Sequence, residues 1–349
     1  MAGAAEILLS KRVQEMVLNG EQPPELYISR DGSEGVDVCS ASTPVPIVDI
    51  SFFSSSVPSD VQGEELQKLR SILSTWGCFQ AIGHGIPTSF LDEVRQVGRE
   101  FFEQPMGEKK KYAKGVNEFA GYGADPVPEE GQFLDWSDRL FLDVYPEDLK
   151  QAIYWPENPK SFRKILEEYT VKIRKVTEVI SRGMAKSLQL QENCFLDHFG
   201  ERATLQARFN YYSCCQRPEV VLGLKPHSDS SGYTLILQDD VQGLQILKHQ
   251  QWVTVPTISN AILVLMGDQM QIMTNGIFKS PVHRVLSNST RERLSVAMFY
   301  TPEPDKDIGP EDSLIREDKP RLFKKVRNYA STHLEYYQRG MRAIHVAEI

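Results

Sequence analysis

The stretch LKPHSDSSGYTLILQ, residues 224–238, decides the fold class of this chain. It begins near a proline, ends in an aliphatic run typical of a buried β-strand, and carries His227 and Asp229 two residues apart. Side chains at positions i and i+2 of a strand point to the same face, so the imidazole and the carboxylate are expected side by side. Such a pair is either a buried polar pair with its own hydrogen-bond partners or part of a metal site.

A third metal ligand would have to come from another strand of the same sheet region. His283, in KSPVHRVLS (residues 279–287), is the histidine on a predicted downstream strand. Two histidines and one carboxylate on one face of an octahedron leave three positions open, as in non-haem Fe(II) oxygenases. The same residues could hold a tetrahedral zinc ion with water as the fourth ligand, so the ligands alone leave both metals open. The remaining histidines are expected in turns, on helices or in the tail: His84, His198, His249, His333 and His345.

The segment RERLSVAMFY, residues 291–300, favours the oxygenase. Arg293 and Ser295 are two apart on a predicted strand and therefore share a face, and in a jelly roll this strand would bring them near the metal. A guanidinium beside a hydroxyl in an apolar strand suits a dicarboxylate, which needs bidentate, charge-assisted hydrogen bonds. Zinc hydrolysis would require neither residue, although each taken alone could have a structural role.

The chain from Thr204 onward has the pattern of a β-sandwich or barrel. Short runs rich in β-branched and aromatic residues follow one another, and glycine, proline, asparagine or aspartate separates most of them. The predicted strands are TLQARFNYY, YTLILQ, GLQILK, QWVTVP, AILVLM, QMQIMT, VHRVL and RLSVAMFY. Upstream, the chain is predicted mostly helical, with short strands in VPIVDIS (residues 45–51) and CFQAIGHGIP (residues 78–87).

Apolar residues at helical spacing predict amphipathic helices on both sides of this region. The stripe over residues 162–184 is wide enough to brace a sheet. An N-terminal helix is predicted from Ile7, Leu8, Leu9, Val13, Met16 and Val17. Further helices are expected over residues 63–77, through Phe101 and Phe102, and over residues 322–337, where the apolar positions are Leu322, Phe323, Val326, Ala330, Leu334 and Tyr337.

Length, charge and cysteine content narrow the class of protein. The 349 residues suffice for one large domain or two, and 39 basic against 47 acidic residues give a net charge of −8. That balance argues against nucleic acid or an anionic membrane surface as partner. Neither a signal peptide nor a membrane span is expected, because the apolar runs are too short. The five cysteines have no disulfide or zinc-knuckle spacing, which favours a cytoplasmic location with ordinary reduced thiols: Cys39, Cys78, Cys194, Cys214 and Cys215.

His227-x-Asp229, His283 after a gap of 53 residues, and Arg293-x-Ser295 resemble the Fe(II)/2-oxoglutarate-dependent dioxygenases. VPIVDIS, WGCFQAIGHGIP, FNYY, GLQILK and GDQMQIMTNGIFKSPVHRV extend the resemblance over nearly the whole chain, toward the plant flavonoid- and alkaloid-modifying branch. The last segment is especially similar to the senescence-related and codeine-demethylase-like members. The resemblance implies an α+β fold, with a double-stranded β-helix, or jelly roll, wrapped by helices. One departure is SCCQRP after NYY, where the family usually has a proline-rich turn, and it puts the shape of that loop in doubt.

The resemblance also implies roles for individual residues. Three would hold Fe(II): His227, Asp229 and His283. Four would contact 2-oxoglutarate: Arg293, Ser295, Tyr212 and Asn210. Five would line a substrate pocket: Arg139, Phe141, Arg208, Phe299 and Thr301. Aromatic side chains with one or two arginines would suit a flat apolar molecule that carries an acidic or hydroxyl group.

The implied activity is the oxidation by O2 of a small, largely apolar plant specialised metabolite or hormone. Hydroxylation, demethylation at an O-methyl or N-methyl carbon, and desaturation are open, with release of succinate and CO2 and with ascorbate as reductant. The alternatives are an ascorbate-dependent oxidase of the same fold and a non-catalytic jelly roll that binds a small molecule. A monomer is expected, with a mainly helical region at 1–200, the catalytic jelly roll at 201–305, and a C-terminal helix and tail at 306–349.

Overall fold

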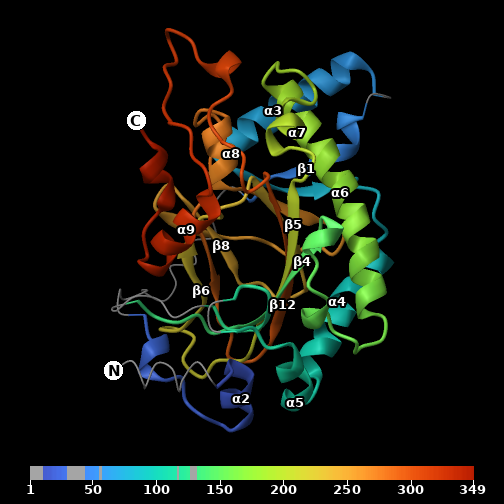
Figure 1. Ribbon diagram of the computed structural model, residues 1–349, viewed down its shortest axis with the longest axis vertical. Helices are drawn as coiled ribbons and strands as arrows, with labels where there is room; N and C mark the ends of the chain where they lie inside the picture. Colours follow the sequence, from blue (N-terminus) through green and yellow to red (C-terminus); the bar gives the residue numbers. More distant parts are fainter. Residues whose placement is uncertain (1–10, 30–43, 55–56, 116–117, 126–131) are drawn as a thin grey trace.

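Two β-sheets form the centre of the computed structural model, which describes residues 11–29, 44–54, 57–115, 118–125 and 132–349 (Figure 1). The larger sheet has eight strands in the spatial order β1 (Ile47–Asp49), β2 (Cys78–Ile82), β10 (Ile262–Met266), β7 (Tyr233–Gln238), β12 (Arg293–Thr301), β5 (Thr204–Tyr212), β4 (Asp138–Tyr145) and β3 (Gly121–Gly123). The smaller sheet has the order β6 (Leu222–His227), β11 (His283–Leu286), β8 (Leu244–Lys248) and β9 (Gln251–Thr254).

The connections between these strands are those of a jelly roll. From β5 onward the chain alternates between the larger and the smaller sheet, except for the β8–β9 hairpin. Apolar side chains from both sheets pack together between them: Tyr212, Leu224, Ile236, Leu244, Ile246, Val285 and Ala297. The predicted double-stranded β-helix is therefore confirmed, and apolar packing between its sheets gives way to polar side chains toward the strand ends.

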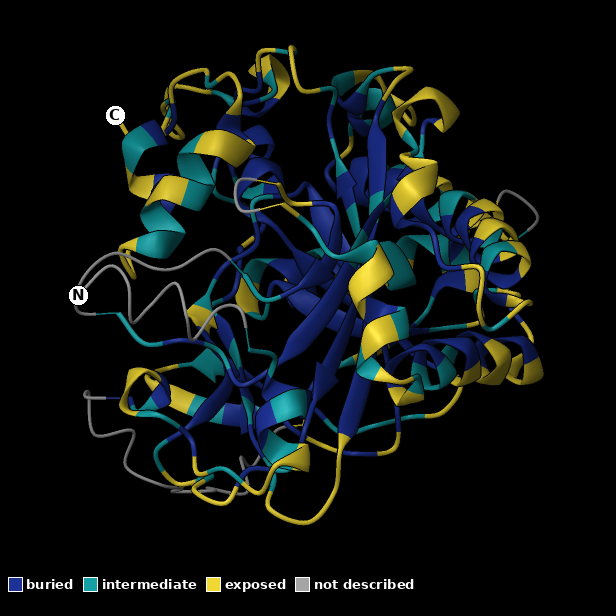
Figure 2. Cartoon of the chain, turned by 60° about the horizontal axis from the view of Figure 1, so that its bottom comes forward, coloured by how far each residue is buried: buried dark blue, intermediate teal, exposed yellow. Residues whose placement is uncertain are grey.

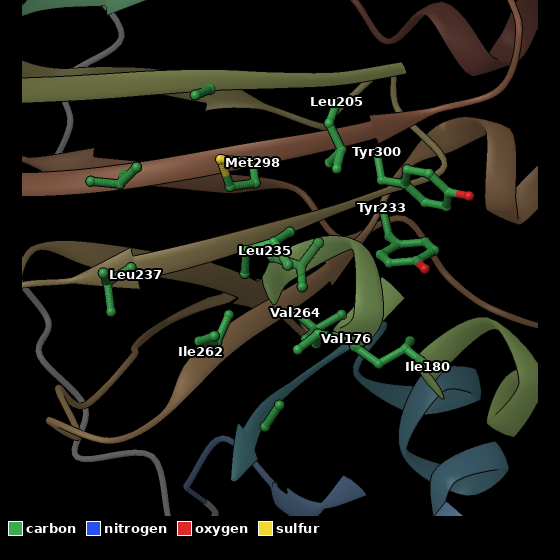
Figure 3. Close-up of a cluster of buried hydrophobic side chains, with 14 of the residues drawn as sticks. Val176, Ile180, Leu205, Tyr233, Leu235, Leu237, Ile262, Val264, Met298 and Tyr300 are labelled. Carbon is green, nitrogen blue, oxygen red and sulfur yellow. The ribbon is translucent and has the colours of Figure 1, made fainter. Parts of the chain in front are cut away.

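Long helices cover the outer face of the larger sheet. They are α3 (Ser59–Thr75), α4 (Thr88–Glu103) and α6 (Phe162–Ser187). Val176 and Ile180 of α6 lie against strand residues such as Leu235 and Val264 in a buried cluster (Figure 3). The Tyr233 hydroxyl, in the same cluster, donates a hydrogen bond of 2.8 Å to a carbonyl of α6. The predicted bracing role of this helix is confirmed, and Figure 2 shows the strands buried while the helices keep an exposed outer side.

The other helices are short. They are α2 (Val13–Leu18), α5 (Met106–Lys109), α7 (Cys194–Phe199), α8 (Asp268–Met273) and α9 (Tyr329–Gln338). Single 3-10 turns lie at Glu25–Tyr27, Ile50–Phe53, Lys110–Tyr112, Glu147–Leu149, Ala152–Tyr154, Asp312–Leu314 and Ala343–Ala347. Among the helices in the described ranges, none has the length and apolarity that crossing a bilayer requires.

Some predicted elements were wrong. QMQIMT is not a strand but most of α8, because a short apolar run fits either structure and here both faces of a helical turn are buried. The last helix begins only at Tyr329, after Asn328 takes a left-handed φ of 53°. Residues 322–326 precede it outside any helix, and Phe323 and Val326 form isolated β-bridges there. The strand β4 was missed in the region predicted mostly helical. Ile7, Leu8 and Leu9 of the N-terminal helix prediction, and Cys39, lie outside the described residues.

Candidate active site

Three side chains with metal-binding groups meet where the two strands β6 and β11 come together. His227 ends β6, His283 begins β11, and the antiparallel register pairs these residues directly. The ring centroids are 4.2 Å apart. Asp229 was predicted on the strand, but it lies in the loop two residues past the end of β6. Its Oδ1 is nevertheless 3.6 Å from Nε2 of His227 and 3.7 Å from Nε2 of His283. The structure thus brings the three predicted ligands into one cluster that could hold a metal ion.

Hydrogen bonds orient the lone pairs of this cluster inward. Nδ1 of His227 donates to the Lys225 carbonyl at 2.8 Å, and Nδ1 of His283 faces the Pro281 carbonyl at 3.3 Å. A carbonyl only accepts, so each Nδ1 carries the proton and each Nε2 keeps a free lone pair on the side of Asp229. The hydroxyl of Thr234 donates to Asp229 Oδ2 at 2.6 Å, which leaves Oδ1 for a ligand.

Burial and neighbouring groups shift the pKa values of His227 and Asp229. Burial, and then the neighbouring imidazole of His283, lowers the pKa of His227 to about 3. Burial alone would raise the pKa of Asp229, but His283, His227 and the Thr234 hydrogen bond lower it below its usual value. Neutral imidazole and ionised carboxylate are the protonation states that metal binding requires. The donor set therefore fits an Fe(II) ion whose three protein ligands occupy one face of its octahedron and leave the other coordination positions for further ligands.

A second polar group lies between the sheets at the start of β12. The pairing of β12 with β5 sets Arg293 opposite Tyr212 and Ser295 opposite Asn210. The guanidinium lies 5.1 Å from the Tyr212 ring centroid, and its Nη1 is 3.5 Å from Ser295 Oγ. The Asn210 amide is 3.4 Å from the same hydroxyl. The four residues predicted to contact 2-oxoglutarate are therefore neighbours.

Arg293 is a buried cation, with 2% of its surface exposed. Its Nε donates to the Val241 carbonyl at 3.1 Å and its Nη2 to Gln238 Oε1 at 2.9 Å, and both acceptors are neutral. A Cβ at Gly243 would lie 3.1 Å from Arg293 Cδ, so glycine permits this close approach. Within the described parts of the chain no carboxylate forms an ion pair with Arg293. A buried charge without a counter-ion is costly, and an anionic ligand would remove that cost.

A cavity of about 410 Å³ opens beside His227 and Asp229. All five predicted substrate residues line it, from β4, β5 and β12: Arg139, Phe141, Arg208, Phe299 and Thr301. The rings of Phe141 and Phe299 are stacked, with centroids 6.2 Å apart. The structure thus brings the predicted pocket and two of the predicted metal ligands to one cavity, and the roles of these residues remain predictions.

The other wall of this cavity comes from α9, which lies on the side of the smaller sheet (Figure 1). His333 donates from Nε2 to the carbonyl of Ser228 at 2.7 Å, and Ser228 is the residue between the candidate ligands His227 and Asp229 in the sequence. Tyr337 meets His227 edge-on at 5.5 Å between centroids and donates to Asp135 at 2.9 Å. The sequence pattern placed Tyr337 on an apolar stripe and His333 on a helix, but it pointed neither one at the site.

Two further histidines have the turn positions predicted for them. The His84 ring accepts from the Ile86 amide at 3.1 Å and donates to the Asn260 carbonyl at 3.0 Å, which confirms a ring bonded to backbone. His249 has a φ of 48° at the β8–β9 turn. Neither histidine takes part in the site.

Comparison with known proteins places this geometry in a family. Residues 203–302 match the 2OG-Fe(II) oxygenase superfamily, and residues 45–160 match the domain described as non-haem dioxygenase in morphine synthesis N-terminal. The chain belongs to the 2OG-Fe(II) oxygenase superfamily. It is therefore an oxidoreductase of the iron- and 2-oxoglutarate-binding class, as the resemblance implied.

Individual relatives from plants support the same assignment. The chain is 40% identical to codeine O-demethylase of Papaver somniferum over 285 residues, 81% of this chain and 79% of that protein. It is 37% identical to jasmonate-induced oxygenase 4 of Arabidopsis thaliana over 82% of this chain and 80% of that one. The crystal structure of JOX2 in complex with 2OG, Fe and JA superimposes with a TM-score of 0.85 and 33% identity, covering 97% of each chain.

Proposed function

We propose that His227, Asp229 and His283 hold Fe(II) and that Arg293 holds the far carboxylate of 2-oxoglutarate. The observation that carries this proposal is the buried guanidinium of Arg293, which has neutral acceptors and no ion pair among the described residues. A dicarboxylate cosubstrate would supply the missing anion. Ser295, Tyr212 and Asn210 complete its surroundings, and their contacts with one another and with Arg293 support this role.

The chain contributes positions and a dry pocket to the reaction. Bound Fe(II), with 2-oxoglutarate and O2, supplies the oxidising chemistry and the cosubstrate leaves as succinate and CO2. The Nδ1 hydrogen bonds of the two histidines fix their ring planes before any ligand binds. Phe141, Phe299 and α9 wall the space next to these ligands, which excludes water and sets one C–H bond of the substrate toward the site.

The shape and chemistry of the cavity favour a flat, apolar substrate. Stacked aromatic rings on one side and Leu224 and Leu334 elsewhere offer surfaces for a ring system rather than a sugar or a peptide. Oxidation of a ring or chain carbon gives a hydroxylated product. Oxidation of a methyl carbon on oxygen or nitrogen gives demethylation, the outcome named for the codeine O-demethylase relative.

Two arginines in the cavity favour a substrate that carries a carboxylate. Asp125 Oδ1 is 2.5 Å from Arg139 Nε, and its Oδ2 is 2.7 Å from Arg208 Nη2. Burial alone would raise the pKa of Asp125, but Arg208 and then Arg139 lower it far below its usual value, so Asp125 is ionised. These three side chains carry a net charge of +1, and of them Arg139 is buried while Asp125 and Arg208 are partly exposed.

One donor of this cluster is still unused. Nη2 of Arg139 has no hydrogen-bond partner among the described residues, although only 1% of the Arg139 surface is exposed. A buried donor without an acceptor is destabilising, and a substrate carboxylate that reaches Arg139 and Arg208 would satisfy it and balance the charge. We therefore propose a small acidic metabolite or hormone, with an apolar ring system, as the substrate.

Matched pairs of acids and their methyl esters test this proposal. The protein is loaded with Fe(II) and 2-oxoglutarate, and succinate release is measured with each member of a panel of plant aromatic and alicyclic acids and with its ester. We expect the acid of a productive pair to stimulate succinate release and the ester to fail. Arg208→Gln should lose the preference for the acid. Equal stimulation by acid and ester would overturn the carboxylate proposal and leave the iron and 2-oxoglutarate roles intact.

We also propose a cytoplasmic monomer that uses ascorbate to keep its iron reduced. Cys78, Cys194, Cys214 and Cys215 are free thiols, which favours a reducing compartment, and the net charge of −8 disfavours nucleic acid as a partner. Light scattering of the purified protein and localisation of a fluorescent fusion test the oligomeric state and the location separately.

A further inference from the structure

A second group of metal-binding side chains lies outside the cavity. Cys194 and His198 are on α7, and Glu311 is in the segment that follows β12. Their potential ligand atoms all lie within 4.8 Å of one another. His198 Nε2 donates to Glu311 Oε2 at 2.8 Å, and Cys194 Sγ is 3.5 Å from the same oxygen. None of the three lines the cavity beside His227 and Asp229.

Local structure aims the two α7 side chains at one point. Residues four apart on a helix share a face, so Cys194 and His198 lie together. Phe195 and Phe199, on the other side of α7, are fully buried and fix the helix, with Phe199 stacked on Tyr300 at 4.3 Å between centroids. The Cys194–His198 face is therefore held half-exposed by a rigid attachment to the core.

Hydrogen bonds also fix the backbone and the side chain of Glu311. Its backbone amide donates to the Met273 carbonyl at 2.9 Å. Its Oε1 accepts from the hydroxyl of Ser313 at 2.7 Å and caps the following turn. This leaves Oε2 as the oxygen presented to the thiol and the imidazole. Three donors from two anchored segments thus converge on one point.

The donor set and the spacing suit zinc. Thiolate, imidazole and carboxylate are the common protein ligands of Zn(II), and bond lengths of about 2.0–2.3 Å in a tetrahedron place neighbouring donors about 3.3–3.6 Å apart. The sulfur-to-oxygen separation of 3.5 Å already has that value. The nitrogen-to-oxygen pair, now 2.8 Å apart, needs to open by about 0.5 Å, because the ion would replace the shared proton.

The charge around the cluster also favours a cation. The segment 303–312 carries five carboxylates, of which Glu311 is one of the three donors and Asp312 is paired with Arg321 at 2.7 Å, and a single lysine, Lys306. Asp197, between the two α7 ligands, adds another carboxylate. Negative charge near a site attracts cations and raises their local concentration.

We propose that Cys194, His198 and Glu311 form a second metal site, for Zn(II), with water in the fourth position. The ion would tie α7 to the segment between β12 and the last helix. This site differs chemically from the oxygenase site. Its thiolate favours zinc, whereas the two histidines and the carboxylate of the oxygenase site accept Fe(II). It stands independently of the proposed substrate and cosubstrate roles.

Cobalt(II) is the probe that separates the two sites in the full-length protein. A thiolate bound to Co(II) gives an intense charge-transfer absorption, and the His227, Asp229 and His283 cluster has no sulfur. We expect the metal-free protein to take up about two equivalents of Co(II) and to show this absorption, because both donor sets bind divalent first-row metals. Cys194→Ser should lose the absorption, and the matched Cys214→Ser should keep it.

A second variant keeps the test decisive if the serine variant misfolds. Glu311→Gln preserves the size of the side chain and its capping oxygen, and it should weaken Co(II) binding at the sulfur site while circular dichroism stays that of the parent. Zn(II) should displace Co(II) and abolish the absorption. Absence of the charge-transfer band in the parent, or its survival in Cys194→Ser, would overturn the proposal.

Discussion

Replacing Arg293 by lysine isolates the role of the planar guanidinium. The change keeps the positive charge between the sheets but removes the fork of donors. Arg293 is oriented through two bonds, from Nε to the Val241 carbonyl and from Nη2 to Gln238. The single nitrogen of lysine cannot keep both bonds and also face a carboxylate in a bidentate way.

The expected loss follows from the bonds that disappear. A hydrogen bond to a charged group is worth about 1.5–3 kcal/mol, and lysine forfeits one such bond to the cosubstrate carboxylate. At about 1.4 kcal/mol per decade this corresponds to a rise of about 10- to 150-fold in the KM for 2-oxoglutarate. Fe(II) binding should be spared, because Arg293 is not among the three candidate iron ligands.

Steady-state succinate formation over a range of 2-oxoglutarate concentrations measures this effect. The matched control is Arg174→Lys. Arg174 on α6 also lies over a tyrosine ring, 3.7 Å from the Tyr145 centroid, but it does not line the cavity or contact the candidate ligands. The control should have the KM of the parent. If Arg293→Lys also kept the parental KM while Fe(II) uptake was normal, the guanidinium would not bind the cosubstrate and the assignment would fail.

Three further predictions concern the metal, the substrate and stability. His283→Ala should lose stoichiometric Fe(II) and turnover together, since two ligands do not make the facial set, and an active variant would remove His283 from the site. Phe141→Ala or Phe299→Ala should consume 2-oxoglutarate with less oxidised product per succinate, because a substrate carbon misplaced by about 1 Å can react about a hundredfold more slowly. An unchanged ratio and rate in both variants would place these rings in the core. Burial raises the pKa of Asp138 to about 6, so the folded state holds this proton more tightly than the unfolded chain does. The free energy of unfolding should therefore fall as the pH rises from about 4 to 6, by up to about 3 kcal/mol. Urea unfolding of Asp138→Asn should lack that fall, and an identical pH slope in parent and variant would contradict the prediction.

The fold and the candidate ligands could be predicted because their signals are local. Runs of β-branched residues between turn residues predict strands whatever their partners are, and a buried histidine or arginine has few structural roles. His283 and Arg293 therefore stand out in the sequence itself. Asp229 was predicted for a reason that is partly wrong, since it lies beyond β6 and the loop, not the shared strand face, brings it to the histidines.

Long-range packing decided the parts that could not be predicted. QMQIMT has the composition of a strand, but its place after β10 buries it as α8. Asp125 is an ordinary acidic residue in a loop until β4 and β5 set two arginines beside it. His333 lies 105 residues from the Ser228 carbonyl that accepts its hydrogen bond. No local pattern contains these pairings, because each depends on where the C-terminal helix or a distant loop returns to the jelly roll.

The most direct test of the central claim is a mass balance with isotopically labelled 2-oxoglutarate. The protein is supplied with Fe(II), O2 and a substrate from the acid panel, and labelled succinate and oxidised product are quantified with and without the cosubstrate. We predict that product forms only when 2-oxoglutarate is present, in equal amount to labelled succinate, and that Asp229→Ala yields neither. Product formed with ascorbate and O2 alone would indicate an ascorbate-dependent oxidase, and substrate binding without any succinate would indicate a binding protein; either result would contradict the account.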